Sequence, residues 1–128
     1  MKIGIGSDHA GFEMKESLKA YLSSLGMEVV DFGCQSAVST DYPDIGYPLA
    51  KAVASSEVDK GILICGTGIG MSIVANKVPG VRAALAGNAH VAKLSREHNN
   101  ANVLVLGARV IGLDEAKEIT RVFLDTQF

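Results

Sequence analysis

Short apolar runs separated by amphipathic stretches repeat along the whole chain. The apolar runs are KIGIGS (2–7), MEVVDF (27–32), KGILIC (60–65), VRAALA (81–86) and ANVLVLG (101–107). Each has the length of a strand, and its apolar residues follow one another directly, as is typical of strands covered on both faces. The pattern therefore predicts five buried β-strands.

An amphipathic stretch follows each of these predicted strands. The first, residues 11–26, carries apolar residues at helical spacing and ends in Gly26, a common helix stop. Asp41 and Pro43 are typical of the start of the second helix, and Asp114 is expected to cap the last one. The other predicted helices cover 45–56, 69–77, 90–98 and 112–126.

The alternation of strands and helices predicts an α/β fold with helices on both faces of a parallel sheet. We expect a three-layer α/β/α, Rossmann-like architecture with a five-stranded parallel sheet, folded as a single domain over residues 1–128. Ligands of such open sheets bind beyond the carboxyl ends of the strands, where the chain order reverses. Here that point is expected between the first and third strands.

Composition and charge exclude several classes of protein. Hydrophobic residues make up 48% of the chain, so a disordered protein is excluded. The net charge is −2 without a basic run, so nothing favours nucleic-acid binding. No apolar run approaches the roughly 20 residues that a membrane span needs. Two cysteines make no disulfide framework, so we expect a cytoplasmic protein with free thiols.

Polar residues and glycines follow the two strands where a ligand is expected. The first strand ends in Ser7, Asp8 and His9, and the third ends in Cys65, followed by GTGIG at 66–70. A glycine loop at a helix N-terminus can bind an anion through its N–H groups, but a plain strand-to-helix turn would have the same sequence. The loop lacks the Lys-Ser/Thr of a P-loop, and it does not follow the first strand as a dinucleotide fingerprint would.

Each candidate side chain also has a purely structural interpretation. Cys65 is either a small apolar residue closing a buried strand or a thiol whose ionised form a helix N-terminus stabilises. Asp8 is a good helix cap, His98 can complement a helix dipole, and Asn99 can end the same helix. Arg109 follows the fifth strand at the same edge of the sheet. Taken together, these groups favour a negatively charged small molecule as the ligand.

Five ordered motifs give the chain a resemblance to a known family. They are GSDHAGFEMK, DYPD, GILICGTGIGMSIVANKVPGVRAAL, SREHNNANVLVLGARVIG and FLDTQF. The sequence resembles the ribose-5-phosphate isomerase type B family, which also includes allose-6-phosphate and galactose-6-phosphate isomerases. The resemblance extends over essentially all 128 residues.

The resemblance implies an aldose–ketose isomerase that needs no metal and no organic cofactor. It implies interconversion of ribose 5-phosphate and ribulose 5-phosphate through an enediolate, in a homodimer or a dimer of dimers whose active sites are shared between subunits. By position, Cys65 matches the base that moves the proton between C2 and C1. Thr67 and His98 match the residues that open the sugar ring.

The resemblance also implies substrate-binding residues. The matching positions are Gly66, Gly68 and Gly70 for the amides that hold the enediolate oxygens, Asp8, Tyr42 and Asn99 for the sugar hydroxyls, and His9 and Arg109 for the phosphate. Family members usually continue past the position of Phe128 into GGRH and further basic residues that complete the phosphate site. We therefore expect Arg109 to contribute more to phosphate binding in these 128 residues than it would in a relative that has the basic tail.

Three alternatives remain at the level of the sequence. Members of the family with another base carry a glutamate at the position of Met71, so this chain resembles the cysteine subgroup, but its motifs do not distinguish a five-carbon from a six-carbon sugar phosphate. A sugar-phosphate-binding protein without activity is a second alternative. A receiver-type regulatory domain is a third, but it needs an aspartate where this chain has Cys65.

Overall fold

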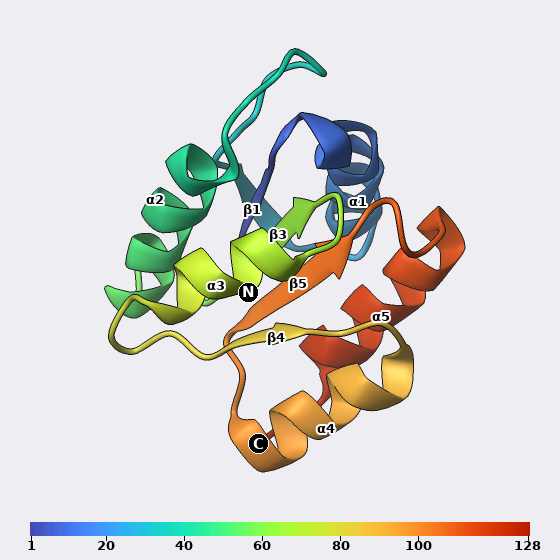
Figure 1. The fold of residues 1–128 in the computed structure, drawn as a ribbon. Helices are drawn as coiled ribbons and strands as arrows, with labels where there is room; N and C mark the ends of the chain where they lie inside the picture. The colour runs from blue at the N-terminus through green and yellow to red at the C-terminus, as the bar shows by residue number, and fades with distance from the viewer.

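All five predicted strands are present in the computed structural model, which describes residues 1–128 (Figure 1). The strands are β1 (Lys2–Ser7), β2 (Glu28–Asp31), β3 (Lys60–Cys65), β4 (Ala83–Leu85) and β5 (Val103–Gly107). They form one sheet in which every neighbouring pair is parallel, in the order β2-β1-β3-β5-β4. The α/β prediction is confirmed, and so is the reversal of chain order between the first and third strands.

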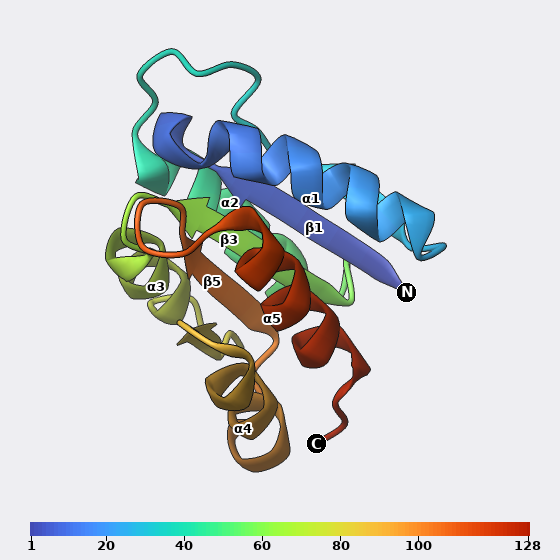
Figure 2. The same cartoon turned by 90° about the vertical axis from the view of Figure 1, so that its right-hand side faces the viewer.

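Helices cover both faces of this sheet (Figure 2). They are α1 (Phe12–Ser24), α2 (Tyr42–Ala54), α3 (Ile69–Asn76), α4 (Ala89–Asn99) and α5 (Leu113–Asp125), and a short 3₁₀ turn, η1 (His9–Gly11), precedes α1. Strand β3 shows how the sequence makes three layers: Ile62 and Ile64 join the core under α1, α4 and α5, whereas Leu63 and Cys65 join the core under α2 and α3. Side chains alternate between the two faces of a strand, so a continuously apolar strand supplies both cores.

Several element boundaries differ from the sequence prediction by one to three residues, as at α2, α5 and β4. Asp41 is the N-cap of α2 and Pro43 lies in its first turn, as expected, although Asp41 makes no side-chain capping bond; the helix starts at Tyr42, before the predicted stretch 45–56, and ends at Ala54. Asp114 does not cap α5: the cap is Gly112, whose N–H donates to Glu115 Oε1 at 3.2 Å. Strand β4 is shorter than predicted, because Arg82 N–H donates to the side chain of Asn102 at 2.8 Å before the ladder begins.

No helix of the chain combines the length and the apolar character that crossing a bilayer requires.

Candidate active site

The carboxyl ends of β1 and β3 meet at the middle of the sheet. Ser7 pairs with Ile64, and the N–H of Asp8 donates to the carbonyl of Ile64 at 3.2 Å. Turn η1 then packs directly on β3, since a β-carbon placed on Gly11 would lie 2.6 Å from Ile64 Cγ2. The two polar clusters that the sequence singled out are therefore neighbours in space.

Asp8 has the capping role that its sequence position allowed. Its Oδ1 accepts the N–H groups of Ala10 at 3.0 Å and Gly11 at 3.2 Å, and the residue is only 8% exposed. Neither bond uses Oδ2, so a second acceptor oxygen remains at the edge of the sheet. The structural role thus leaves half of the carboxylate for a ligand.

Gly68 shapes the loop that follows β3. It has a φ of +85°, in the left-handed region that favours glycine, and it is the N-cap of α3. A β-carbon at this position would also lie 2.4 Å from Leu85 Cδ1. Gly68 makes no side-chain capping bond, and the N–H groups of a first helical turn have no acceptor within their own helix. The loop therefore presents N–H groups at the positive end of a helix dipole.

Cys65 lies directly under this loop, on the face of the sheet that α2 and α3 cover. The residue is 5% exposed and belongs to the core that includes Leu49 and Met71. Its carbonyl accepts the N–H of Ala108 at 2.8 Å, which joins the ends of β3 and β5. Packing alone accounts for a small residue here, but Cys65 is also the last residue of β3, directly before the glycine loop at 66–70.

Arg109 reaches the glycine loop from the end of β5. Its N–H donates to the carbonyl of Gly66 at 2.9 Å, and its guanidinium lies over the same residue: a β-carbon on Gly66 would be 3.4 Å from Nη1. Thr67 is exposed, and its Oγ1 accepts the N–H of Ile69 at 3.2 Å. A cation and a hydroxyl therefore flank the same stretch of backbone.

Tyr42 and His9 enclose the site from the side of β2. Tyr42 begins α2, and its ring lies on the first turn of α3, since a β-carbon on Gly70 would be 2.7 Å from Tyr42 Cζ. His9 is half-buried, and its Nδ1 lies 3.1 Å from the backbone nitrogen of Thr40. The connection between β2 and α2 thus supplies one wall of the site.

His98 and Asn99 lie at the opposite edge of the sheet. They are exposed residues in the last turn of α4, which ends just before β5 begins at Val103, whereas Cys65 pairs with Gly107 at the other end of β5. Four strand residues of about 3.3 Å each put on the order of 13 Å between the two edges. A single chain therefore does not bring His98 and Asn99 to Cys65.

Two buried groups near the site were missed in the sequence. Cys34 is buried, with its Sγ 3.8 Å from Ser7 Oγ and 3.1 Å from the carbonyl oxygen of Ser36. Lys15 has a side chain with no exposed surface. A lysine at the spacing of Leu18 and Leu22 lies on the buried stripe of its helix, and that spacing is the signal by which it could have been found.

Lys15 belongs to a cluster of four charges that holds β2 to α1. Asp31 Oδ2 accepts the ammonium groups of Lys15 and Lys19, each at 2.7 Å, and Glu16 Oε2 accepts them at 2.9 and 3.1 Å. Burial opposes ionisation of Asp31, but the hydrogen bonds from the two lysines and from Gly33 N–H outweigh it and hold the pKa of Asp31 below its ordinary value. Hydrogen bonds from the same lysines lower the pKa of Glu16.

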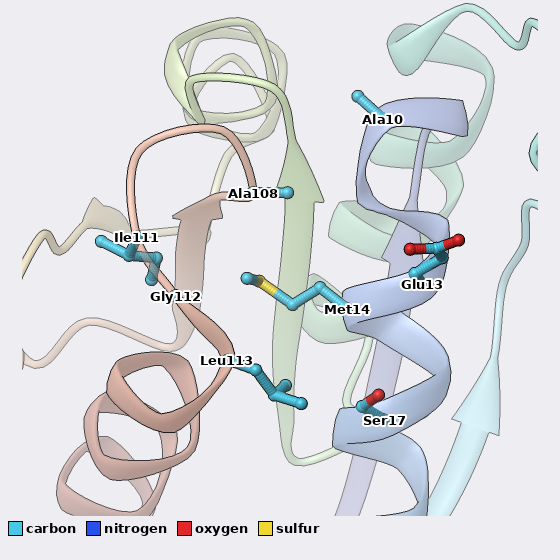
Figure 3. A pocket seen from close by; sticks show the side chains of 8 residues that line it. All are labelled: Ala10, Glu13, Met14, Ser17, Ala108, Ile111, Gly112 and Leu113. Atoms are coloured by element: carbon cyan, nitrogen blue, oxygen red, sulfur yellow. The ribbon is translucent and has the colours of Figure 1, made fainter.

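No closed cavity covers the candidate site in a single chain. One hollow, of about 340 Å³, lies between α1 and the connection from β5 to α5 (Figure 3), and the other, of about 360 Å³, lies at the amino edge beside Lys60 and Arg96. Neither is lined by Cys65 or by the glycine loop. No three His, Cys, Asp or Glu side chains converge so that they could hold a metal ion.

Comparisons with known proteins agree with this architecture. The family model described as Ribose/Galactose Isomerase matches residues 3–128. The chain is 50% identical to ribose-5-phosphate isomerase B of Escherichia coli, over 99% of this chain and 85% of the relative. It is 45% identical to D-erythrulose-4-phosphate isomerase of Pectobacterium atrosepticum, over 100% and 85%. A solved structure of ribose-5-phosphate isomerase B from Clostridium thermocellum superposes with a TM-score of 0.99 at 55% identity, covering 100% of this chain and 86% of that one.

Proposed function

The chain belongs to the ribose/galactose isomerase family, and on that premise we propose that it interconverts ribose 5-phosphate and ribulose 5-phosphate. The observation that carries the proposal is the position of Cys65, a shielded thiol at the end of β3 under the amides of a preformed glycine loop. An aldose–ketose isomerase that works through an enediolate needs a base and donors for the oxyanion side by side, and these two groups can supply them. This substrate belongs to the pentose phosphate pathway, and we propose that the enzyme acts in that pathway, in the cytoplasm.

The proton transfer assigns a separate task to each group. The thiolate of Cys65 removes the proton from C2 of the open-chain aldose, and the C–H electron pair forms the C1–C2 double bond while O1 becomes an oxyanion. Backbone N–H groups of Gly66, Gly68 and Gly70 stabilise that oxyanion, since donors fixed in advance need no reorganisation. A proton then passes from O2 to O1, the carbonyl forms at C2, and the electron pair of the C1–C2 double bond takes the proton back from the thiol at C1.

The remaining contacts orient the sugar phosphate. The free Oδ2 of Asp8 accepts a hydrogen bond from one sugar hydroxyl, and the hydroxyl of Tyr42 donates a hydrogen bond to another. His9 and Arg109 bind the phosphate. Support comes from the guanidinium of Arg109, which lies over Gly66 within reach of a ligand on the loop. Thr67, exposed at the same loop, assists opening of the ring.

We assign His98 and Asn99 to the site of a second copy of the chain. Their place at the amino edge supports this assignment, because they cannot serve the Cys65 of their own chain. The open site supports it as well, since neither hollow of the single chain covers Cys65. In a homodimer, or in a dimer of dimers, His98 from one subunit opens the ring of the sugar bound beside Cys65 of the other.

Parallel assays test the proposed reaction. Purified protein is incubated with ribose 5-phosphate, allose 6-phosphate, galactose 6-phosphate and erythrulose 4-phosphate, and kcat/KM is compared. Ribose 5-phosphate is expected to give the highest value. The four-carbon substrate is included because a relative at 45% identity carries that name. A higher kcat/KM for another sugar phosphate would mean that this compound is the substrate of the same reaction. Binding of the sugar phosphates without turnover of any of them would contradict the enzymatic assignment.

A further inference from the structure

The ring of His9 contacts the main chain of a residue that lies far away in sequence. Nδ1 of His9 is 3.1 Å from the backbone nitrogen of Thr40 and 3.3 Å from the carbonyl oxygen of the same residue. Thr40 therefore presents both a donor and an acceptor to one ring nitrogen. No other hydrogen bond to this ring occurs in the chain.

These two contacts favour one position for the proton of the neutral ring. A neutral imidazole carries one N–H and one lone pair, and the lone pair must be on the nitrogen that accepts a hydrogen bond. The nitrogen of Thr40 lies closer to Nδ1, at 3.1 Å, than the carbonyl oxygen does, at 3.3 Å, which favours Nδ1 as the acceptor and the ring proton on Nε2. When the ring is protonated, Nδ1–H can donate to the carbonyl of Thr40 instead. In both states Nε2 carries a hydrogen.

We propose that the main chain of Thr40 is a positioning group that fixes neutral His9 as the Nε2–H tautomer, so that His9 donates a hydrogen bond to a bound phosphate whether or not it is charged. The tautomer is inferred from the shorter of the two contacts. The identity of the anion rests on the proposed function, in which His9 binds the substrate phosphate. Thr40 itself does not touch the substrate.

The segment that carries Thr40 is held at both ends. At its start, Ser7 N–H donates to the carbonyl of Gly33 at 2.7 Å and Cys34 N–H donates to the carbonyl of Ser7 at 2.9 Å. At its end, Tyr42 begins α2 and packs on α3. Residues 35–39 between these anchors are exposed, and the segment arches beyond the carboxyl edge next to the turn that holds His9 (Figures 1 and 2). Thr40 is thus delivered to His9 by fixed neighbours on either side.

No charged side chain competes with Thr40 for the ring. The charged residues on the elements around His9 are Asp8 before it, Glu13 on α1, Asp41 and Asp44 at the start of α2, and Arg109 beyond β5. None of these forms an ion pair with His9. Asp8 already accepts two backbone N–H groups through Oδ1. The contact with Thr40 is therefore what distinguishes the two ring nitrogens.

The tautomer can be measured in the unmodified protein. Long-range ¹H–¹⁵N correlation spectra distinguish the two neutral tautomers, and a His9→Gln variant identifies the signal of His9 by its loss. His90 and His98, which are both exposed, serve as references in the same spectrum. At roughly pH 8, where imidazoles are largely neutral, His9 is expected as Nε2–H. A spectrum of the Nδ1–H form, or of the same mixture of tautomers as that of the exposed histidines, would overturn the proposal.

A pair of variants at Thr40 tests the consequence for binding. Thr40→Pro removes the N–H, whereas the matched control Thr40→Ala keeps it and loses only the hydroxyl that donates to Val38. The probe is inorganic phosphate, and the measured quantity is the ratio of the variant's Kd to that of the parent protein. For Thr40→Pro we expect a ratio of about ten at a pH where the spectrum shows His9 neutral, and near one at a lower pH where it shows the imidazolium, which carries a hydrogen on Nε2 regardless. Thr40→Ala should give a ratio near one at both.

The outcomes separate this inference from the proposed function. An equal loss at both pH values, or no loss at the higher one, would mean that Thr40 only supports the loop. If Thr40→Pro does not fold, the spectrum of the parent protein still decides. An Nε2–H ring in a protein without isomerase activity would leave the inference standing and remove the function. An Nδ1–H ring in an active isomerase would do the reverse.

Discussion

The ring of Tyr42 covers Gly70 so closely that no side chain fits between them. A β-carbon on Gly70 would lie 2.7 to 3.0 Å from three atoms of that ring. Gly70→Ala must therefore displace Tyr42 from the wall of the site, although alanine is the better helix residue. We expect KM for ribose 5-phosphate to rise while the thermal midpoint changes little. Gly87→Ala, where a β-carbon would meet nothing within 4 Å, is the matched control. An unchanged KM for Gly70→Ala would show that the position of Tyr42 does not matter for binding.

Replacing Cys65 tests the assignment of the base. Cys65→Ala should lower kcat by orders of magnitude while ribose 5-phosphate still binds, because the proton acceptor is lost and the amides remain. The measurements are steady-state kinetics and exchange of the C2 hydrogen with solvent. Cys34→Ala is the control, since Cys34 is the other buried free thiol. This variant should retain most of the turnover. Near-normal exchange in Cys65→Ala would return this residue to a purely packing role.

Mixing two inactive variants tests the shared site. Cys65→Ala and His98→Ala each remove one half of every site, but a mixed dimer contains one site with both residues intact. With random exchange between equal amounts of the two, about a quarter of the parent activity should return, given a two-fold symmetric dimer. Exchange of subunits is verified independently by mass spectrometry of differently labelled chains. Proven exchange without recovered activity would contradict the shared site.

Arg109 is the strongest candidate for phosphate binding among the described residues. A charge-assisted hydrogen bond contributes about 1.5–3 kcal/mol, so Arg109→Ala should raise KM roughly ten- to a hundredfold. Arg109→Lys should recover only part of this, because an ammonium does not reproduce the planar fork of a guanidinium. Arg121→Ala is the control, since its i,i+4 partner Asp125 is exposed and far from the site. An unchanged KM in Arg109→Ala would show that the substrate phosphate binds at other residues.

The ionic cluster around Asp31 predicts how stability depends on pH. The folded protein lowers the pKa of Asp31 and Glu16, so it favours their ionised forms. This stabilisation is complete above the ordinary carboxyl values of about 4 and is lost as the pH falls through the lowered ones. At the alkaline side, the hydrogen bond to Asp31 raises the pKa of Lys19, so its contribution is lost only as the pH rises through that raised value.

The Asp31→Asn variant isolates this cluster. We expect it to lower the free energy of unfolding at neutral pH by about 1–3 kcal/mol, because Lys15 is fully buried and keeps only Glu16 as a partner. Its acid limb should be flatter than that of the parent in urea unfolding at several pH values. Asp125→Asn, which removes an exposed pair, should change little. Parallel acid limbs for parent and Asp31→Asn would contradict the lowered pKa.

The fold was predictable because the strand signal and the burial have the same cause. Strands β1 and β3 have the predicted bounds, since an uninterrupted run of apolar residues and glycines fits a strand between two helical layers. Helix ends were less predictable: Asp114 is a good cap by type, yet the side chain of Glu115 satisfies the end of α5 from inside the helix. Which of several neighbouring residues caps a helix depends on the local backbone geometry, and the spacing of residue types in the sequence does not determine that geometry.

The candidate site was predictable as far as topology determines it. The neighbouring ends of β1 and β3 bring Asp8 to Cys65, and a rule about strand order suffices for that. The contact of Thr40 with His9 leaves no trace in the sequence, because it is made by main-chain atoms that every residue has. The distance of His98 from Cys65 follows from the direction of α4 and becomes visible only when the layers are assembled.

Gly68 limits how this enzyme can change in evolution. Its left-handed backbone and the close approach of Leu85 both exclude a side chain. The glycine loop at Gly68, which forms the floor of the site, therefore tolerates almost no single substitution there. Variation is open in the wall formed by the connection between β2 and α2, at Tyr42 and in the exposed residues 35–39. New substrate preferences therefore arise by rebuilding the walls around an unchanged floor, and a mutant library aimed at another sugar phosphate should be randomised there.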